Sequence, residues 1–174
     1  MKITVFGGAN PRPGQPAYQE AMRLGMLLAQ AGHTVLTGGY MGTMEAVLRG
    51  AAEAGGHTIG VTCQEIENWR KSPLNAWVQE EWKRQTLADR LVTLMDSADA
   101  MIALPGGPGT LTEISLAWNR LLVESLSPRP LILIGDGWKA VFELFYQSLS
   151  AYVPPEVRPL LTFAGTVDDA VRLV

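Results

Sequence analysis

Short apolar runs alternate with longer segments of helical periodicity along this chain, and this alternation limits the fold more than any other feature. Runs that predict buried strands cover residues 3–7, 34–37, 58–62, 100–104 and 131–134, with an extended piece near 160–163. Segments that predict helices cover residues 17–31, 43–54, about 82–97, 110–122, 138–149 and about 167–173. Such alternation is typical of βαβ units. We therefore predict an α/β fold, a Rossmann-like, doubly wound parallel sheet with helices on both faces.

The chain has 174 residues, a length that fits one domain with a sizeable core. No linker, repeat or low-complexity segment divides it, so residues 1–174 are predicted to form one domain. Residues 64–81 are the least regular stretch, with Pro73, two Asn and two Trp. We predict a long excursion there, serving as a lid or an interface element. Residues 152–159 contain three prolines and predict a turn-rich connection.

In a sheet of this type, ligands bind beyond the carboxyl ends of the strands, where loops lead into helices. Four loops qualify, namely residues 7–16, 38–42, 63 onward and 105–109, and three of them are rich in glycine. The last runs from a buried strand into a helix, so its backbone N–H groups lie beside a positive helix start, which favours a phosphate. The glycine-rich loops therefore predict a phosphate and nucleotide site. Its predicted contacts are Gly8, Gly38, Gly39, Gly42, Thr43, Gly106, Gly107, Gly109 and Thr110.

The charge and the motifs exclude several ligand classes. A net charge of −3 gives no field for a polyanion, so no nucleic-acid partner is predicted. No G-x-x-x-x-G-K-[ST] or G-x-G-x-x-G is present, and the second strand ends in Thr37-Gly38-Gly39 rather than in an acidic residue for NAD. No apolar run approaches the length of a membrane span, and the start lacks the shape of a signal peptide. We expect a cytoplasmic protein without a membrane partner.

The placement of histidine, cysteine and lysine argues against a metal or a cofactor. His33 and His57 come just before their strands and so belong to the opposite edge of the sheet. Cys63 is the only cysteine, which leaves no disulfide framework or thiolate metal cluster. Pyridoxal phosphate needs a Schiff-base lysine, and no lysine stands in a glycine-rich loop; the four are Lys2, Lys71, Lys83 and Lys139. We predict no metal and no cofactor.

Several stretches, read together, resemble a known family over nearly the whole chain. They are residues 6–9, Tyr18 and residues 37–44, 55–61 and 104–113. The last reads L-P-G-G-P-G-T-L-T-E and is similar to the motif P-G-G-x-G-T-x-x-E, here in a strand–turn–helix setting. By these residues the chain resembles the LOG family, the cytokinin riboside 5′-monophosphate phosphoribohydrolases, often labelled "lysine decarboxylase".

The resemblance implies hydrolysis of the N-glycosidic bond of a nucleoside 5′-monophosphate, releasing free base and ribose 5-phosphate. It implies that Gly106, Gly107, Gly109 and Thr110 hold the phosphate. The family's arginine falls on Arg90 and its motif glutamate on Glu113, which become the implied catalytic residues. Glycosidic cleavage passes through an oxocarbenium-like state that a nearby carboxylate stabilises. A Rossmann-like fold and a homodimer or higher homo-oligomer are also implied.

Three positions depart from the family pattern. Leu91 stands where the family has lysine, Pro108 where an aromatic residue is usual, and Glu45 where glycine is usual. With one expected cation missing, an alternative function is a non-catalytic carrier or sensor that binds a phosphorylated nucleotide or cofactor on the same loops.

Both implied catalytic residues also have a purely structural interpretation. Thr110 and Glu113 fit a capping box, with Thr110 as N-cap and Glu113 at the third helical position, a role that catalysis does not exclude. Arg90 fits a solvated helix residue paired with Asp89 or Asp96.

Overall fold

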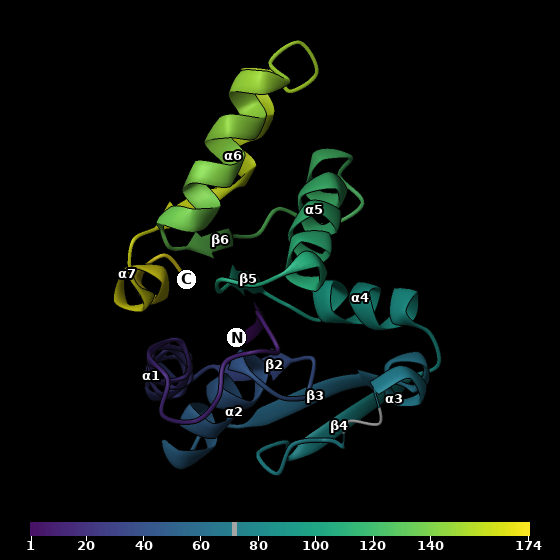
Figure 1. Ribbon diagram of the computed structural model, residues 1–174, viewed down its shortest axis with the longest axis vertical. Coiled ribbons are helices and arrows are strands. Elements are labelled where there is room, and N and C mark those ends of the chain that lie inside the picture. Colours follow the sequence, from purple (N-terminus) through teal and green to yellow (C-terminus); the bar gives the residue numbers. More distant parts are fainter. Residues whose placement is uncertain (71–72) are drawn as a thin grey trace.

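The structure, a computed structural model, describes residues 1–70 and 73–174, and these form a seven-stranded parallel sheet covered by helices (Figure 1). The strands are β1 (Lys2–Phe6), β2 (Thr34–Thr37), β3 (Thr58–Cys63), β4 (Glu80–Arg84), β5 (Ala100–Ala103), β6 (Leu131–Ile134) and β7 (Thr162–Ala164). The helices are α1 (Pro16–Gln30), α2 (Thr43–Glu53), α3 (Gln64–Arg70), α4 (Leu87–Asp96), α5 (Pro108–Leu122), α6 (Asp136–Ser148), α7 (Val167–Arg172) and the 3-10 helix η1 (Pro155–Leu160). The predicted Rossmann-like α/β fold is confirmed.

The strand order is β4-β3-β2-β1-β5-β6-β7, and every neighbouring pair is parallel. The chain starts in the middle of the sheet, builds outward to β4, and then returns so that β5 pairs with the free side of β1. In register, Ile3 lies opposite Val35 on one side and Ala100 on the other. The direction of winding therefore reverses between β1 and β5. The crevice at the carboxyl ends of such a pair is where ligands bind in open α/β sheets.

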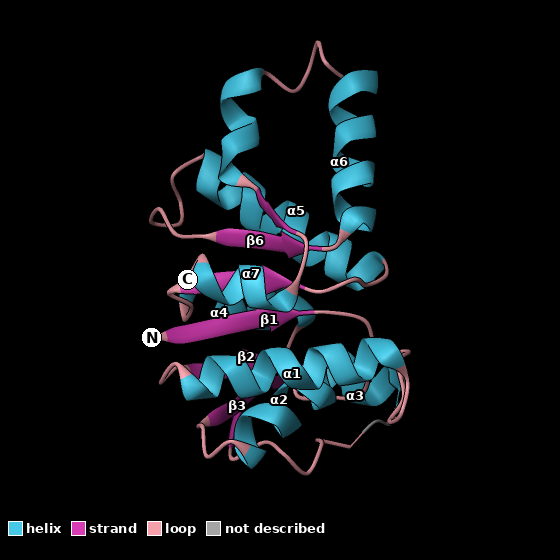
Figure 2. Cartoon of the chain, turned by 90° about the vertical axis from the view of Figure 1, so that its left-hand side faces the viewer, coloured by secondary structure: helices cyan, strands magenta, loops and turns pink. Residues whose placement is uncertain are grey.

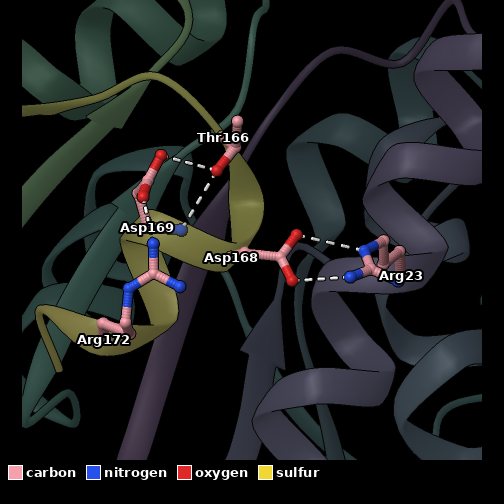
Figure 3. A network of polar contacts seen from close by, with 5 residues as sticks. All are labelled: Arg23, Thr166, Asp168, Asp169 and Arg172. Atoms are coloured by element: carbon pink, nitrogen blue, oxygen red, sulfur yellow. Dashed lines mark hydrogen bonds and ion pairs between the residues drawn. The ribbon is translucent and has the colours of Figure 1, made fainter.

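Helices cover both faces of the sheet, which explains why the central strands are mostly apolar and most of their polar residues are buried threonines. The core on one face packs α1, α2 and α7 against the strands, and Figure 2 shows α1 and α7 in front of them. The core on the other face packs α4, α5, α6 and η1. Helix α7 is joined to α1 by the ion pair between Arg23 and Asp168 (Figure 3). The start of α7 is capped by Thr166, whose side chain accepts from the Asp169 N–H.

The prediction of one helix over about residues 82–97 is wrong at its start. Residues 82–84 belong to the edge strand β4, which pairs with β3, and α4 begins only at Leu87. The strand sequence, Glu-Glu-Trp-Lys-Arg, is charged because an edge strand faces solvent, so it lacks the apolar run that marked the central strands. The start of α4 is set by Thr86, whose side chain accepts from the Asp89 N–H.

The described part of the irregular stretch 64–81 contains more regular structure than its sequence predicted. It contains α3, and its last two residues begin β4. The interpretation of this stretch as a lid or interface element stays a prediction, and Lys71 lies outside the described residues. Of the helices in the described part of the chain, none is long and apolar enough to span a membrane.

The capping-box interpretation of residues 110–113 is wrong. Helix α5 begins at Pro108 with Gly107 as its N-cap, and no side chain caps it. Proline is favoured at the first helical position because its fixed φ suits the helix and its missing N–H has no intrahelical role there. Thr110 is therefore inside the first turn, and Glu113 lies on the second turn, where it is free for another role.

Candidate functional site

A cavity of about 250 Å³ opens at the carboxyl edge of the sheet, above the reversal between β1 and β5. Its lining comes from the loop after β1 (residues 7–10), from Tyr40 and Met44 near the start of α2, and from Ile66, Arg90, residues 107–110 and Glu113. Five segments far apart in the sequence thus converge on one site, at the edge that the sequence predicted.

The start of α5 forms one wall of the cavity and supplies backbone donors. The Leu111 N–H donates to the Gly107 carbonyl at 3.0 Å, which closes the first helical turn. The N–H groups of Gly109 and Thr110 precede that bond, so the helix ladder has no acceptor for them. They lie at the positive end of the α5 dipole, which favours an anion. Pro108 also lines this wall and contributes no N–H.

The glycines of this loop divide into two kinds. A Cβ on Gly106 would lie 2.2 Å from Thr110 Oγ1, so that residue is glycine because of packing within the protein. A Cβ on Gly107 or Gly109 would meet no atom within 4 Å, yet both residues line the cavity. Packing does not require glycine at these two positions. The space beside them is available to a ligand.

Arg90 and Glu113 meet in the cavity wall, where α4 and α5 pack side by side on the same face of the sheet. Arg90 Nη1 lies 3.7 Å from Glu113 Oε1, and the side chains are only 5% and 11% exposed. The Arg90 Nε–H donates to the Val61 carbonyl at 2.8 Å, which fixes the guanidinium. The structure thus places the two implied catalytic residues together. The Asp89 carboxylate accepts from the Thr86 hydroxyl and Asp96 pairs with Arg120, so the alternative that paired Arg90 with either of them is wrong.

Burial raises the pKa of the Glu113 carboxyl to about 7, and the nearby Arg90 guanidinium lowers it by a smaller amount. Desolvation penalises the charged carboxylate more than one cation at this distance offsets. Glu113 therefore changes protonation near neutral pH. A carboxyl group with this property can both accept and return a proton at pH 7.

The second glycine loop mostly holds the site together from outside the cavity lining. The N–H and hydroxyl of Thr43 donate to the Gly8 carbonyl at 2.9 and 3.1 Å, which joins the first two loops. Gly42 has a φ of 75°, and a Cβ there would lie 2.4 Å from that carbonyl oxygen. A Cβ on Gly38 would lie 1.7 Å from Arg90 Nη2, and one on Gly39 would press on Gly60. These four predicted contacts thus have packing roles, whereas Gly8 lines the cavity.

Tyr40 is a lining residue that the sequence analysis did not single out. Its hydroxyl accepts from the Cys63 N–H at 3.0 Å and donates to the Cys63 carbonyl at 3.2 Å, at the end of β3. The Arg90 guanidinium lies 5.8 Å from the centre of the Tyr40 ring, within cation–π range. The sequence signal that could have identified Tyr40 as a site residue was its position inside a glycine-rich loop. No such signal marked Ile66, because it lies in the irregular stretch 64–81.

The structure also places the two histidines and the three departures from the family pattern. His33 and His57 immediately precede β2 and β3, so their predicted place at the opposite edge is confirmed. Leu91 is buried and Glu45 accepts a hydrogen bond from the Tyr18 hydroxyl at 2.9 Å, and neither lines the described cavity. Of the three departures from the family pattern, only Pro108 touches the site.

Comparison with known proteins gives both a family and two kinds of relative. The family model described as "SLOG cluster4 family" matches residues 1–136. An uncharacterised protein of Archaeoglobus fulgidus is 32% identical, over 78% of this chain and 85% of its own. The cytokinin riboside 5′-monophosphate phosphoribohydrolase of Mycobacterium tuberculosis is 28% identical, over 98% and 91%. The solved molybdenum cofactor binding protein of the phototrophic bacterium Rippkaea orientalis is 27% identical with a TM-score of 0.76, over 99% and 93%.

Proposed function

The chain belongs to the SLOG cluster4 family, and from this premise we propose that it hydrolyses the N-glycosidic bond of a nucleoside 5′-monophosphate. The products are the free base and ribose 5-phosphate. The observation that carries the proposal is the buried pair of Arg90 and Glu113, 3.7 Å apart, in a cavity whose adjoining wall is the start of α5. A relative named as a phosphoribohydrolase, similar over nearly the whole chain, supports the same activity.

In this proposal the substrate phosphate binds at the start of α5. The N–H groups of Gly109 and Thr110 donate to phosphate oxygens, and the helix dipole adds favourable charge. The open space beside Gly107 and Gly109 lets the phosphate approach the backbone closely. Gly8 and Gly106 shape the adjoining loop. No metal ion or cofactor takes part in the proposed reaction.

Glu113 acts on the water that attacks C1′ of the ribose. The new C1′–O bond forms as the C1′–N bond breaks, and the electron pair of the broken bond leaves with the base. Glu113, in its ionised form, accepts the proton from the water and then delivers it to the base nitrogen. A pKa of about 7 suits both steps, since the group neither holds nor releases the proton too strongly at neutral pH. The carboxylate also stabilises the positive charge that develops on the sugar.

The test is a cleavage panel with purified protein, AMP and N6-substituted adenosine monophosphates, and chromatographic detection of free base. The expected result is release of base in equal amount to ribose 5-phosphate. Glu113→Gln is expected to bind the monophosphates and to lower the rate by about 100-fold or more. Glu143→Gln, a change of the same kind at an exposed position on α6, serves as the matched control. A Glu113→Gln variant that cleaves at the parental rate would contradict the catalytic role.

A second candidate function, a carrier or sensor for a phosphorylated nucleotide or cofactor, is favoured by the likeness to the molybdenum cofactor binding protein. It uses the same cradle at the start of α5 and asks only for binding. The cleavage panel separates the two functions, because tight binding of a monophosphate without release of base supports the carrier and contradicts the hydrolase.

We also propose that the protein forms a homodimer or a higher homo-oligomer. Exposed apolar side chains gather on α5, α6 and the residues after each of these helices, and Figure 1 shows α6 extending away from the sheet beyond β6. These exposed residues include Leu122, Val123, Leu144, Phe145, Leu149 and Tyr152. Exposed apolar groups gathered in this way often mark protein interfaces. Light scattering coupled to gel filtration is expected to give a mass above 18.9 kDa, the mass of one chain.

A further inference from the structure

The charges of the cavity wall leave a bound phosphate incompletely neutralised. Arg90 is the only cation among the described lining residues, and it faces the Glu113 carboxyl. The start of a helix is equivalent to roughly half a positive charge. A phosphate monoester carries nearly two negative charges at neutral pH. A second cation near the cradle would therefore strengthen binding, and Leu91 does not supply it.

Arg12 is a cation in the first glycine-rich loop, three residues beyond the cavity-lining Ala9. One of its guanidinium N–H groups donates from Nη1 to the Ala9 carbonyl at 2.8 Å, so its head group is held beside the cavity wall. Arg12 is exposed, and no carboxylate of the described chain lies within ion-pair distance of it. Its other guanidinium donors are therefore available to an anionic ligand.

The loop that carries Arg12 is held in shape before any ligand binds. The Arg12 N–H donates to the Gln15 side chain at 2.7 Å, and the Gln15 N–H donates back to the Arg12 carbonyl at 3.0 Å. Pro11 and Pro13 flank the arginine and restrict the backbone further. Little conformational entropy is therefore lost when the guanidinium engages a ligand.

The first loop is also in contact with the loop that leads into α5. A Cβ on Gly106 would lie 3.1 Å from the Gly8 nitrogen, and one on Gly8 would lie 3.4 Å from the Gly106 Cα. Ala9 and residues 107–110 also line the same cavity. The residue that anchors Arg12 and the start of α5 therefore belong to one site.

We propose that Arg12 binds the phosphate of the ligand, as an outer clamp opposite the N–H groups of Gly109 and Thr110. The planar guanidinium can present two parallel N–H groups to two phosphate oxygens. The inference rests on the proposed function for the position of the phosphate. It needs only binding, so it holds for a hydrolase and for a carrier alike.

The test compares AMP, adenosine and inorganic phosphate by titration calorimetry with the whole protein. Arg12→Gln is expected to weaken AMP and phosphate binding by about tenfold, the size of a lost charge-assisted contact at an exposed site, and to leave adenosine binding unchanged. Arg12→Lys, which keeps the charge, is expected to recover most of that loss. If the parent cleaves AMP, Arg12→Gln raises KM and leaves kcat near the parental value.

Arg172→Gln is the matched control, because it removes the same charge from an exposed position on α7. Equal AMP binding by the parent and Arg12→Gln would overturn the inference while the proposed function stands. A loss of adenosine binding as large as the loss of AMP binding would overturn it too, since the loop and not the charge would then be responsible. Absence of AMP binding by the parent would overturn both.

Discussion

Glu113→Gln is expected to stabilise the protein above pH 7 while it removes the proposed activity. Glu113 is buried, and its pKa in the folded protein is about 7 against 4.5 for the free side chain. The folded state therefore binds the Glu113 proton more tightly than the unfolded state does. The stability that comes from this proton is fully present below pH 4.5, falls as the pH rises toward 7, and is lost above it.

The magnitude follows from the difference between the two pKa values. Raising the pKa from 4.5 to about 7 is a shift of about 2.5 units. At 1.36 kcal/mol per unit, ionising Glu113 in the folded state costs about 3 kcal/mol of unfolding free energy. Glutamine has nearly the same shape and does not titrate. The variant should match the parent near pH 4.5 and exceed its free energy of unfolding by about 3 kcal/mol at pH 8.

The assay is urea unfolding followed by tryptophan fluorescence, at intervals from pH 4.5 to pH 8. Subtracting the parent's unfolding free energy from the variant's at each pH removes the titrations that both share. Glu143→Gln reports what the same change does at an exposed site of α6. A difference between Glu113→Gln and the parent that stays constant across this range would refute the reasoning, because Glu113 would then not titrate with a raised pKa.

Two further predictions use matched pairs of residues. Gly109 and Gly137 each occupy the second position of a helix and have open space beside them. Gly109→Ala and Gly137→Ala should therefore both keep the free energy of unfolding or raise it by up to about 1 kcal/mol, whereas only Gly109→Ala should lose AMP binding. Equal AMP affinity in the two variants would show that the open space beside Gly109 is not the ligand site. Thr86 and Thr166 are the N-caps of α4 and α7, and each side chain accepts a bond from the N–H three residues later. Changing either threonine to alanine should lower the free energy of unfolding by about 1 kcal/mol in denaturant melts. Only Thr86→Ala, at the start of the helix that carries Arg90, should also lower the cleavage rate. A Thr166→Ala variant that lost as much activity would point to a general effect of instability.

The sequence predicted the parts of the fold that are buried on both sides. The central strands carry mostly apolar residues because helices cover both of their faces, and such runs are visible without a structure. The edge strand β4 was missed because solvent accepts its charged side chains, which leaves pairing with β3 as the evidence for a strand. Local sequence does not show which distant segments pair as strands.

The same distinction applies to the site. The glycine-rich loop before α5 could be found because backbone donors at a helix start need only local sequence. The pairing of Arg90 with Glu113 could not be found in this way, since it depends on how α4 and α5 pack on the sheet. The resemblance named the two residues but not their pairing. The capping-box interpretation failed on a local signal, Pro108, which sets the helix start two residues earlier than Thr110.

The central place of β1 has a consequence for how the protein is made. The Lys2 N–H bonds to the Asp99 carboxylate across 97 positions of sequence, and β1 pairs with β5 beside it. A ribosome delivers the amino terminus first, so one side of β1 has no partner strand until residue 103 has emerged. The nascent chain must therefore keep this strand edge away from other chains while the residues between β1 and β5 are synthesised. The cavity is lined by the loop after β1 and by residues that follow β5, so it is completed only after β5 has paired with β1.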